Sequence, residues 1–331
     1  MVIGIKLEAP SGTSLKSLVT GFVLTKQTEG KSRRTVEYYG DNLRRFVWYA
    51  HEQGWPDDIR HLTQWHIKDF LGYVGTSKAR WGLNGNGSET SQHPASHSTV
   101  RHYFVVLSCF FSWLVSEDFI SENPMAKIKV GKAKPKVITP YSSEEIFRML
   151  AVCDLDYAHG AKFLGSRNRV IILILLDTGI RLSELTRMYV ADIDAESGKF
   201  KVFGKGRKER IVRLGKMARK ALWRYLMHRP QKKSSELWLT EEGKPLNLNG
   251  IQSMVKRLKE RAGVNGSGTV HRFRHTFALA FLRADKNVFN LQYLLGHSDL
   301  DMVRRYTAAL GVEDALKAHE KASPADLLGL R

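Results

Sequence analysis

The chain has 331 residues, which is longer than one ordinary hydrophobic core accommodates, so two domains are expected. Lys and Arg total 52 against 33 Asp and Glu, giving a formal charge of +19 and a pI near 9.9, which favours a polyanionic partner. The two cysteines exclude a disulfide-rich secreted scaffold and favour a reducing compartment. The first residues lack a charged head followed by a long apolar stretch, so no secretory signal is expected. The longest apolar run, 170–176, is far short of the ~20 residues of a membrane span.

The first part of the chain predicts a helical domain over 12–126, after a tail over 1–11. Apolar residues recur at helical spacing, and four helices are expected, at about 12–30, 33–53, 63–74 and 97–118. The stretch GTSKARWGLNGNGSETSQHPASHS between the last two is rich in Gly, Ser and Asn and predicts a flexible loop.

Basic residues mark two places in this part of the chain. Arg33, Arg34, Arg44 and Arg45 lie on the second predicted helix, where their ordinary interpretation is a solvated face. The stretch KIKVGKAKPK opens a predicted linker over 127–140, because Gly and Pro interrupt it. Its lysines, Lys132, Lys134 and Lys136, are candidate phosphate contacts of the nonspecific, salt-sensitive kind.

The remainder, 141–310, predicts a second domain of the mainly α (α+β) class. It begins with a serine cap and an acidic first turn at 142–145. Strands are few: a hairpin over 199–214, which gives a small antiparallel sheet, and a short strand at 237–240. Helices are expected at about 143–153, 166–177, 181–188, 216–229, 249–263, 271–284, 287–295 and 301–307.

Four motifs in this second domain carry residue types that bind phosphate. They are TGIRLSEL with Arg181, FGKGRKER with Lys205, HRFRHTFA with His271 and Arg274, and LLGHSDLDMVRRYT with His297 and Tyr306. Each alone has an ordinary interpretation, such as a surface arginine, a hairpin-tip lysine, a basic helical face or a packed tyrosine. Their order and spacing together resemble the tyrosine recombinase family, the phage integrases and Xer-like enzymes, over roughly residues 140–310.

The resemblance implies that Tyr306 attacks the scissile phosphate, forms a 3′-phosphotyrosyl bond and releases a 5′ hydroxyl. Arg181 and Arg274 would stabilise charge on the phosphate, because a guanidinium stays charged and presents a planar fork to two oxygens. His271 and His297 would add hydrogen bonds, and His271 would also exchange the proton of the nucleophile. A phenol with a pKa near 10 needs such neighbours to react at neutral pH.

Three further residues complete the expected site. The resemblance implies that Lys205, at the tip of the predicted hairpin, protonates the departing 5′ oxygen. Glu184 either orients a neighbouring cation or imidazole or forms only a surface ion pair, and His275 is a second supporting residue.

No cofactor or metal is expected. The phosphotyrosyl bond preserves the energy of the phosphodiester, so rejoining needs no ATP, and the arginines take the place of a divalent cation. The alternative is a zinc site at His271 and His275 with His297. It is disfavoured because Arg272 stands where the HExxH motif has glutamate, and because Arg274 would repel a cation.

The resemblance also implies the protein's partners. A four-helix core-binding domain would clamp double-stranded DNA, with Arg33, Arg34, Arg44 and Arg45 of its second helix as candidate phosphate or base contacts. A tetramer on two DNA sites would carry out integration, excision or resolution in the cytoplasm, with possible accessory DNA-bending proteins and no membrane. A type IB-like topoisomerase and a non-cutting DNA-binding protein of the same fold are the alternatives. The tail over 311–331 would dock on its own domain or in trans, whereas the target sequence and the host element stay open.

Overall fold

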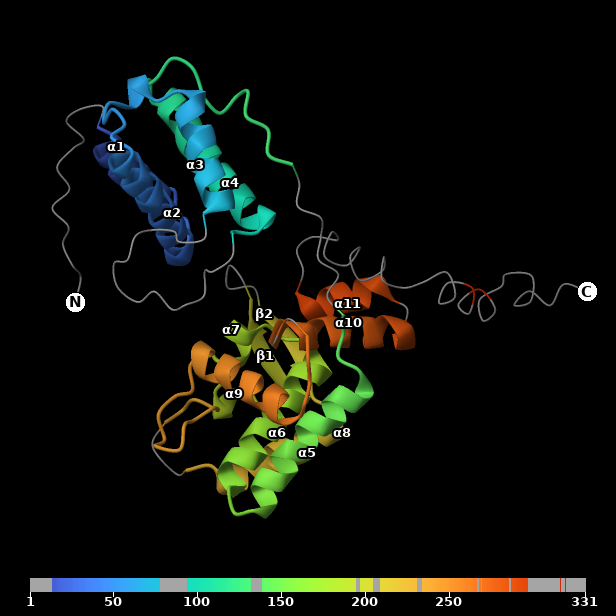
Figure 1. The fold of residues 1–331 in the computed structure, drawn as a ribbon. Helices are drawn as coiled ribbons and strands as arrows, with labels where there is room; N and C mark the ends of the chain where they lie inside the picture. Colours follow the sequence, from blue (N-terminus) through green and yellow to red (C-terminus); the bar gives the residue numbers. More distant parts are fainter. Residues whose placement is uncertain are drawn as a thin grey trace, which may run out of the picture. The chain divides into compact units, whose positions relative to one another are not determined.

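The computed structural model describes the residues 14–77, 94–131, 139–194, 197–204, 209–230, 234–266, 268, 270–285, 287–296, 316 and 319. The chain divides into two compact units, with the division between Pro135 and Lys136. The described main chain is mostly helical and contains a two-stranded antiparallel sheet (Figure 1), which confirms the predicted fold class.

Among the described residues, four α-helices build the N-terminal unit. The side chains of Ser32, Thr63 and Ser96 cap the second, third and fourth by accepting backbone N–H bonds. Their ends lie within about three residues of the predicted ones. The helices are α1 (Leu15–Thr28), α2 (Arg33–Glu52), α3 (Gln64–Thr76) and α4 (His97–Ser116), with a short 3-10 turn, η1 (Ile59–His61), before α3.

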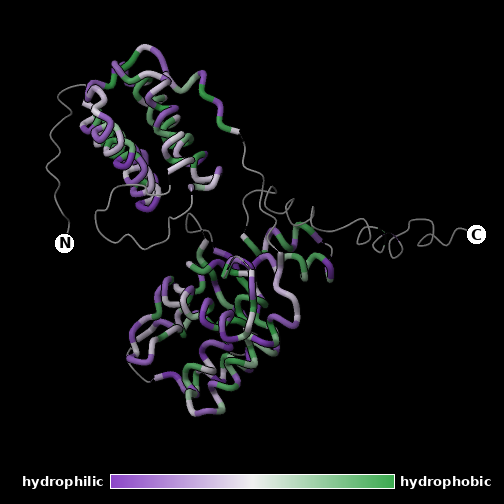
Figure 2. The backbone as a smooth tube through the Cα atoms, in the orientation of Figure 1, coloured by the Kyte–Doolittle hydropathy of each residue, from purple (hydrophilic) through white to green (hydrophobic). Residues whose placement is uncertain are grey.

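An aromatic core holds these helices together. Phe22, Phe46, Phe70 and Phe110 are fully buried. Their rings meet edge to face, with centroids 5.0 Å apart for Phe46 and Phe70 and 5.5 Å for Phe22 and Phe110. By length and composition α4 is apolar enough to cross a membrane, yet seven of its residues, Phe110 among them, are buried in this core. Hydrophobic and hydrophilic residues follow one another within the helical turns (Figure 2), as expected for helices with one buried side.

The segment after α4 folds back on the N-terminal unit. Ile128 is buried there, and Arg101 of α4 donates a hydrogen bond to the backbone oxygen of Val130 at 2.8 Å. The first residues of the predicted linker, 127–131, are therefore part of this unit's packing.

The C-terminal unit is built around α6, which packs against α5, α8 and α10. The middle of α6 is apolar on nearly every side, and Val170, Ile171 and Ile174 are fully buried. The described elements are α5 (Ser143–Ala158), α6 (Lys162–Thr178), α7 (Leu182–Leu185), η2 (Val190–Asp192), β1 (Lys199–Phe203), β2 (Glu209–Arg213), α8 (Lys216–His228), α9 (Leu248–Arg261), α10 (Val270–Asp285) and α11 (Val288–Leu295).

The predicted hairpin over 199–214 is confirmed. Strands β1 and β2 pair antiparallel, with Lys199 opposite Arg213 and Phe203 opposite Glu209. Alternate residues of each strand are buried, so the hairpin rests one face on the core. The turn between the strands, which contains Lys205, lies outside the described residues.

Two local predictions are wrong. Residues 237–240 contain one isolated bridge, between Leu239 and Pro245, instead of a strand, and α7 ends at Leu185 instead of continuing to 188. Two contacts account for this: the Trp238 ring N–H donates to the Leu185 carbonyl at 2.8 Å, and the Leu237 N–H donates to the Met188 carbonyl at 2.8 Å. The backbone groups that would extend the helix or pair a strand are satisfied by these bonds instead.

Candidate active site

A tight turn places Arg181. Helix α6 ends at Thr178 and is capped by Gly179, whose φ of 57° is in the left-handed region that glycine adopts without strain. A Cβ at this position would lie 2.4 Å from the ring of Phe277 on α10. The glycine of TGIRLSEL therefore allows the chain to turn against α10, and Arg181 follows directly at the start of α7.

Glu184 holds Arg181 in place. The Arg181 guanidinium donates through Nη1 to Oε1 of Glu184 at 2.9 Å, and the Arg181 backbone N–H donates to Oε2 at 2.8 Å. The Glu184 side chain is 2% exposed and that of Arg181 is 36% exposed. The interpretation of Glu184 as a surface ion pair is therefore wrong, and Arg181 is oriented by a buried carboxylate while it still reaches solvent.

Arg274 is fixed by backbone carbonyls. It is 2% exposed, and it donates through Nη1 to the Gly179 oxygen and through Nη2 to the Leu295 oxygen, both at 2.7 Å. Arg181 Nη2 donates to the neighbouring Gly296 oxygen at 3.4 Å. Two guanidiniums from distant parts of the sequence thus meet at the backbone of residues 295–296.

His271 and His275 lie on the first turns of α10. Their rings meet edge to face with centroids 5.0 Å apart, and His271 is exposed while His275 is partly buried. Although the His271 side chain reaches solvent, the groups around it remove part of its hydration, which lowers its pKa, and the positive charges of Arg274 and Arg181 lower this pKa further. His271 is therefore held toward its neutral form, which accepts a proton.

Arg210 of β2 completes this cluster, although sequence reasoning did not single it out. It is buried and donates to both carboxylate oxygens of Glu184, at 2.9 and 2.7 Å, and through Nε to the Leu294 oxygen at 2.8 Å. Burial would raise the pKa of Glu184, but the hydrogen bonds from Arg210 and Arg181 outweigh it and lower this pKa. The available signal was a charged residue at an inward position of the hairpin, alternating with Val212.

Arg272 has a different task from its neighbours in HRFRHTFA. It is buried, donates to the Thr139 oxygen and to Glu145 at 2.8 Å each, and lies 4.0 Å from the centroid of the Tyr141 ring. It thereby anchors the first residues of the C-terminal unit to α10.

The candidate DNA contacts on α2 are all exposed. Arg33 donates to Glu37 at 2.8 Å, Arg44 pairs with Asp41, and Arg45 donates to the Tyr103 hydroxyl at 2.9 Å. The ion pairs of Arg33 and Arg44 are solvent-exposed and therefore weak, whereas Arg45 bonds to the buried Tyr103. The remaining candidates lie outside the described residues: Lys132, Lys134, Lys136, Lys205, His297 and Tyr306.

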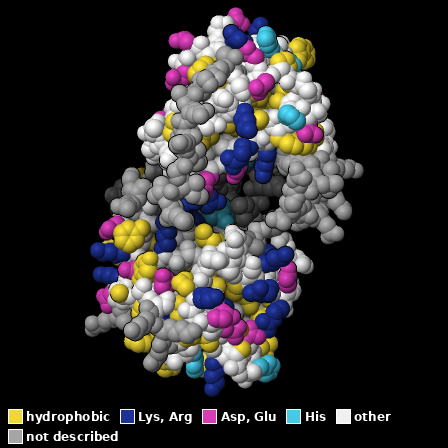
Figure 3. All heavy atoms as spheres, turned by 90° about the vertical axis from the view of Figure 1, so that its left-hand side faces the viewer, with side chains coloured by type: hydrophobic (Ala, Val, Ile, Leu, Met, Phe, Trp, Pro, Cys, Tyr) yellow, Lys and Arg dark blue, Asp and Glu magenta, His cyan; other side chains and the backbone are white. Residues whose placement is uncertain are grey.

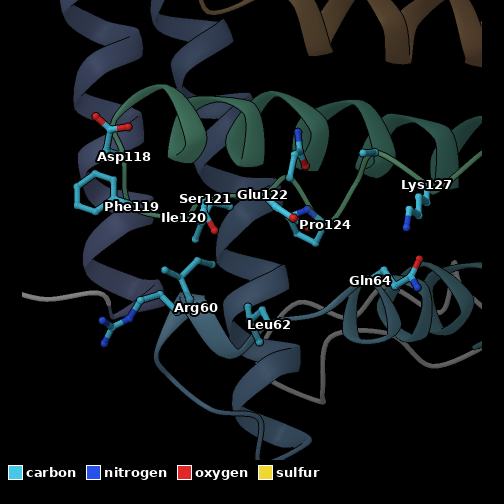
Figure 4. Close-up of a pocket in the computed structure, with 13 residues that line it drawn as sticks. Arg60, Leu62, Gln64, Asp118, Phe119, Ile120, Ser121, Glu122, Pro124 and Lys127 are labelled. Carbon is cyan, nitrogen blue, oxygen red and sulfur yellow. The ribbon is translucent and has the colours of Figure 1, made fainter.

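Among the described residues there is no candidate metal centre, and this cluster does not line the pocket of the N-terminal unit. In the part of the chain that the structure describes, no group of three or more His, Cys, Asp or Glu side chains could hold a metal ion. A pocket of about 750 Å³ lies between residues 59–64 and 118–127, where Arg60 and Leu62 face Phe119 and Pro124 (Figure 4). None of the described motif residues lines it.

Comparison with known proteins agrees with this geometry. The model of the phage integrase family matches residues 141–311. The chain is 28% identical to the tyrosine recombinase XerC of Thermodesulfovibrio yellowstonii, over 94% of this chain and 98% of that protein. It is 30% identical to the tyrosine recombinase XerD of Staphylococcus haemolyticus, over 84% of this chain and 89% of that protein.

Solved structures share the fold. XerH recombinase bound to a palindromic difH substrate superposes with a TM-score of 0.68 at 23% identity, covering 95% of this chain and 85% of XerH. A lambda integrase dimer bound to a COC′ core site gives a TM-score of 0.66 at 18% identity, covering 88% and 77%. A lambda integrase tetramer bound to a Holliday junction gives 0.66 at 17% identity, covering 90% and 78%.

Proposed function

The chain belongs to the phage integrase family of tyrosine recombinases, and we propose that Tyr306 is the nucleophile with which it exchanges DNA strands. The protein is a site-specific recombinase that cuts and rejoins DNA, a reaction that in this family requires neither metal nor ATP. A 3′-phosphotyrosyl intermediate on Tyr306 stores the energy of the broken phosphodiester, and a 5′ hydroxyl from another strand recovers it on rejoining.

The observation that carries the proposal is the convergence of Arg181 and Arg274. Both guanidiniums donate to carbonyls of residues 295–296, and Arg274 also donates to Gly179, so their positions are set before DNA arrives. Fixed cations cost no reorganisation as charge grows on the nonbridging phosphate oxygens, so they favour the transition state over the ground state. Removing one such donor typically slows a reaction by about 100- to 1,000-fold.

The remaining roles follow from chemistry and position. His271, exposed and held toward its neutral form, takes the proton from the Tyr306 phenol, while His297 adds a hydrogen bond to the phosphate. Lys205, on the turn between β1 and β2, protonates the 5′ oxygen as it leaves. Glu184 orients Arg181 without contacting the phosphate, and His275 supports the His271 ring.

Binding and assembly are proposed on broader grounds. Lys and Arg side chains lie on the visible surfaces of both units, mixed with acidic ones (Figure 3), so the +19 charge is not confined to one tail. Arg33, Arg34, Arg44 and Arg45, together with Lys132, Lys134 and Lys136, supply phosphate contacts to double-stranded DNA. Four copies hold two sites together, with accessory DNA-bending proteins where the site requires them, in the cytoplasm at the nucleoid.

Replacement of Tyr306 by Phe tests the proposal. Tyr306→Phe keeps the ring and removes only the attacking oxygen, so DNA binding should persist while the covalent adduct disappears. In a nicked suicide substrate, cleavage releases a short fragment that carries the 5′ hydroxyl, and the loss of this fragment prevents rejoining. The covalent adduct accumulates, and a denaturing gel separates protein-linked DNA from free DNA. Tyr293→Phe, which alters an exposed tyrosine of α11 in the same way, is the matched control and should cleave normally. A Tyr306→Phe protein that still trapped DNA would show that another residue is the nucleophile.

A further inference from the structure

Arg210 lies where three parts of the C-terminal unit meet. It belongs to β2, the strand that follows the Lys205 turn, and its guanidinium takes both carboxylate oxygens of Glu184. Its Nε donates to the Leu294 carbonyl near the end of α11. One buried side chain thus connects the hairpin, the segment that carries Arg181 and the segment that leads to His297.

Gly296 shows how closely this contact is fitted. The φ of Gly296 is 62°, and a Cβ there would lie 3.0 Å from Nη1 and 3.1 Å from Cδ of Arg210. The guanidinium therefore packs on the backbone of Gly296, whose carbonyl accepts the hydrogen bond from Arg181. Any displacement of Arg210 shifts both groups that hold Arg181, namely the Glu184 carboxylate and the Gly296 carbonyl.

We propose that Arg210 is a positioning residue for DNA cleavage, which sets the orientation of Arg181 through Glu184 and the 294–296 backbone without contacting DNA. The inference rests on the proposed function, because it assumes that Arg181 stabilises the scissile phosphate. With a 6% exposed side chain, Arg210 is too deeply buried to meet DNA itself. Its planar fork matches two carboxylate oxygens and leaves Nε for a third acceptor, an arrangement that one lysine ammonium cannot reproduce.

The first experiment measures single-turnover cleavage of the suicide substrate. Arg210→Met and Arg210→Lys should each slow cleavage by roughly 10- to 100-fold, as losses of supporting residues do, with unchanged affinity for a single site. Arg213→Met is the matched control, because Arg213 lies on the same strand with its side chain exposed, and it should cleave normally. Normal cleavage by Arg210→Lys would overturn the proposal.

Double variants test whether Arg210 affects cleavage through Arg181. On an Arg181→Ala background, Arg210→Met should cause no further loss, because the residue that it positions is gone. Multiplied losses would mean that Arg210 acts independently of Arg181 and would overturn the inference. If Arg181→Ala itself cleaves at the normal rate, the proposed function fails, whereas a slow Arg181→Ala beside a normal Arg210→Met contradicts only the role of Arg210.

A sulfur-substituted substrate separates Arg181 from Lys205. Lys205→Ala should regain much of its rate when the bridging 5′ oxygen is sulfur, because a thiolate leaves without a proton. Arg210→Met should show no such recovery, since its defect concerns the phosphate clamp. Recovery would mean that Arg210 acts through the hairpin and Lys205, contrary to the proposal.

Removing the buried charges of both Glu184 and Arg210 distinguishes a loss of positioning from a folding defect. Arg210→Met alone leaves Glu184 with one cationic partner, whereas Glu184→Gln/Arg210→Met leaves no uncompensated carboxylate and should unfold at a higher temperature than the single variant. The proposal expects cleavage to stay slow in this double variant. Cleavage that returned together with thermal stability would show that Arg210 serves only to fold the protein.

Discussion

A guanidinium that already donates to two backbone carbonyls cannot swing away from its position, and this separates Arg274 from an ordinary surface arginine. Its bonds to Gly179 and Leu295 are made to backbone carbonyls, which carry no net charge and so leave its own charge intact at these contacts. Arg181 differs, because Glu184 lies between it and a second cation, Arg210. The local surplus of positive charge therefore remains available to a phosphate.

The environment of His271 predicts a pH dependence. Loss of hydration, with the charges of Arg274 and Arg181, lowers the pKa of His271 from 6.5. Since the neutral ring accepts the proton of Tyr306, the cleavage rate should fall as the pH drops below 6.5, with its midpoint at the lowered pKa. Single-turnover rates between about pH 5 and 8 measure this midpoint.

Two variants serve as controls for the pH profile. His271→Gln should cleave slowly and lose the acid limb, because the amide does not titrate. Arg181→Ala should move the limb of its residual activity upward, because one of the charges that lowers the pKa of His271 is gone. A wild-type midpoint above 6.5 would contradict the assignment of His271 as the proton acceptor.

At the residue scale, the sequence predicted the residues proposed to act on the phosphate better than the residues that hold them in position. Arg181, His271 and Arg274 could be named because their motifs contain them in a recognisable order. Arg210 stands within a quoted motif, yet its role depends on burial against Glu184 and the Leu294 carbonyl, contacts that no local pattern encodes. Whether a charged side chain is buried is decided by distant segments, so such residues emerge only from the fold.

At the scale of elements, helices were predictable where one face meets a core. The starts of α2 and α4 agree with the predicted ones, which rested on apolar periodicity, and in the structure a capping serine precedes each of them. By contrast, α7 was predicted too long, because the Trp238 ring takes the carbonyl of its last residue. Short elements lack the repeated pattern that identifies long ones, and their length is set by tertiary contacts.

The turn after α6 gives a stability prediction. Gly179→Ala would place a methyl group at left-handed φ and 2.4 Å from the Phe277 ring. Backbone strain of about 1–2 kcal/mol adds to overpacking of about 1–3 kcal/mol, so the free energy of unfolding should fall by about 3 kcal/mol. Denaturant titration of the full-length protein, followed by circular dichroism, measures the change.

A second glycine provides the matched control for this prediction. Gly263, after α9 in the same unit, has a φ of 60°, and a Cβ there would meet only the end of the Arg148 side chain at 3.6 Å. Gly263→Ala should therefore cost only the backbone strain of about 1–2 kcal/mol. Equal losses for the two variants would show that the contact with Phe277 adds nothing.

At the scale of the whole molecule, recombination and topoisomerase activity have to be distinguished by their products, because both pass through the same covalent intermediate. The same tyrosyl intermediate either rejoins its own strand, which relaxes supercoils, or accepts a strand from a second site. Substrates with paired sites yield recombinant DNA only in the second case. The sequence could suggest this outcome through resemblance, but the partner site is not encoded in any residue pattern, so its base sequence could not be predicted.

The tail over 311–331 supplies the prediction that belongs to assembly. Val312, Ala315 and Leu316 recur at helical spacing, and Leu316 is helical and 60% exposed. An apolar stripe too small for its own core has to be covered, and docking on a neighbouring copy would use anchors at this spacing. We propose docking in trans, which would make the position of Tyr306 depend on the next copy in the assembly.

Deletion of residues 311–331 tests this dependence. The truncated protein should bind a single site with normal affinity, because the deletion spares every proposed DNA contact, but synapsis of two sites and recombination should be lost. Gel shifts with one and two labelled sites measure binding and synapsis, and a recombination assay measures product. Leu316→Asp in the full-length chain is the finer variant, since it places a charge in the stripe without shortening the tail. Docking on the same copy would instead leave synapsis intact in both proteins, and in that case the tail would serve only its own domain.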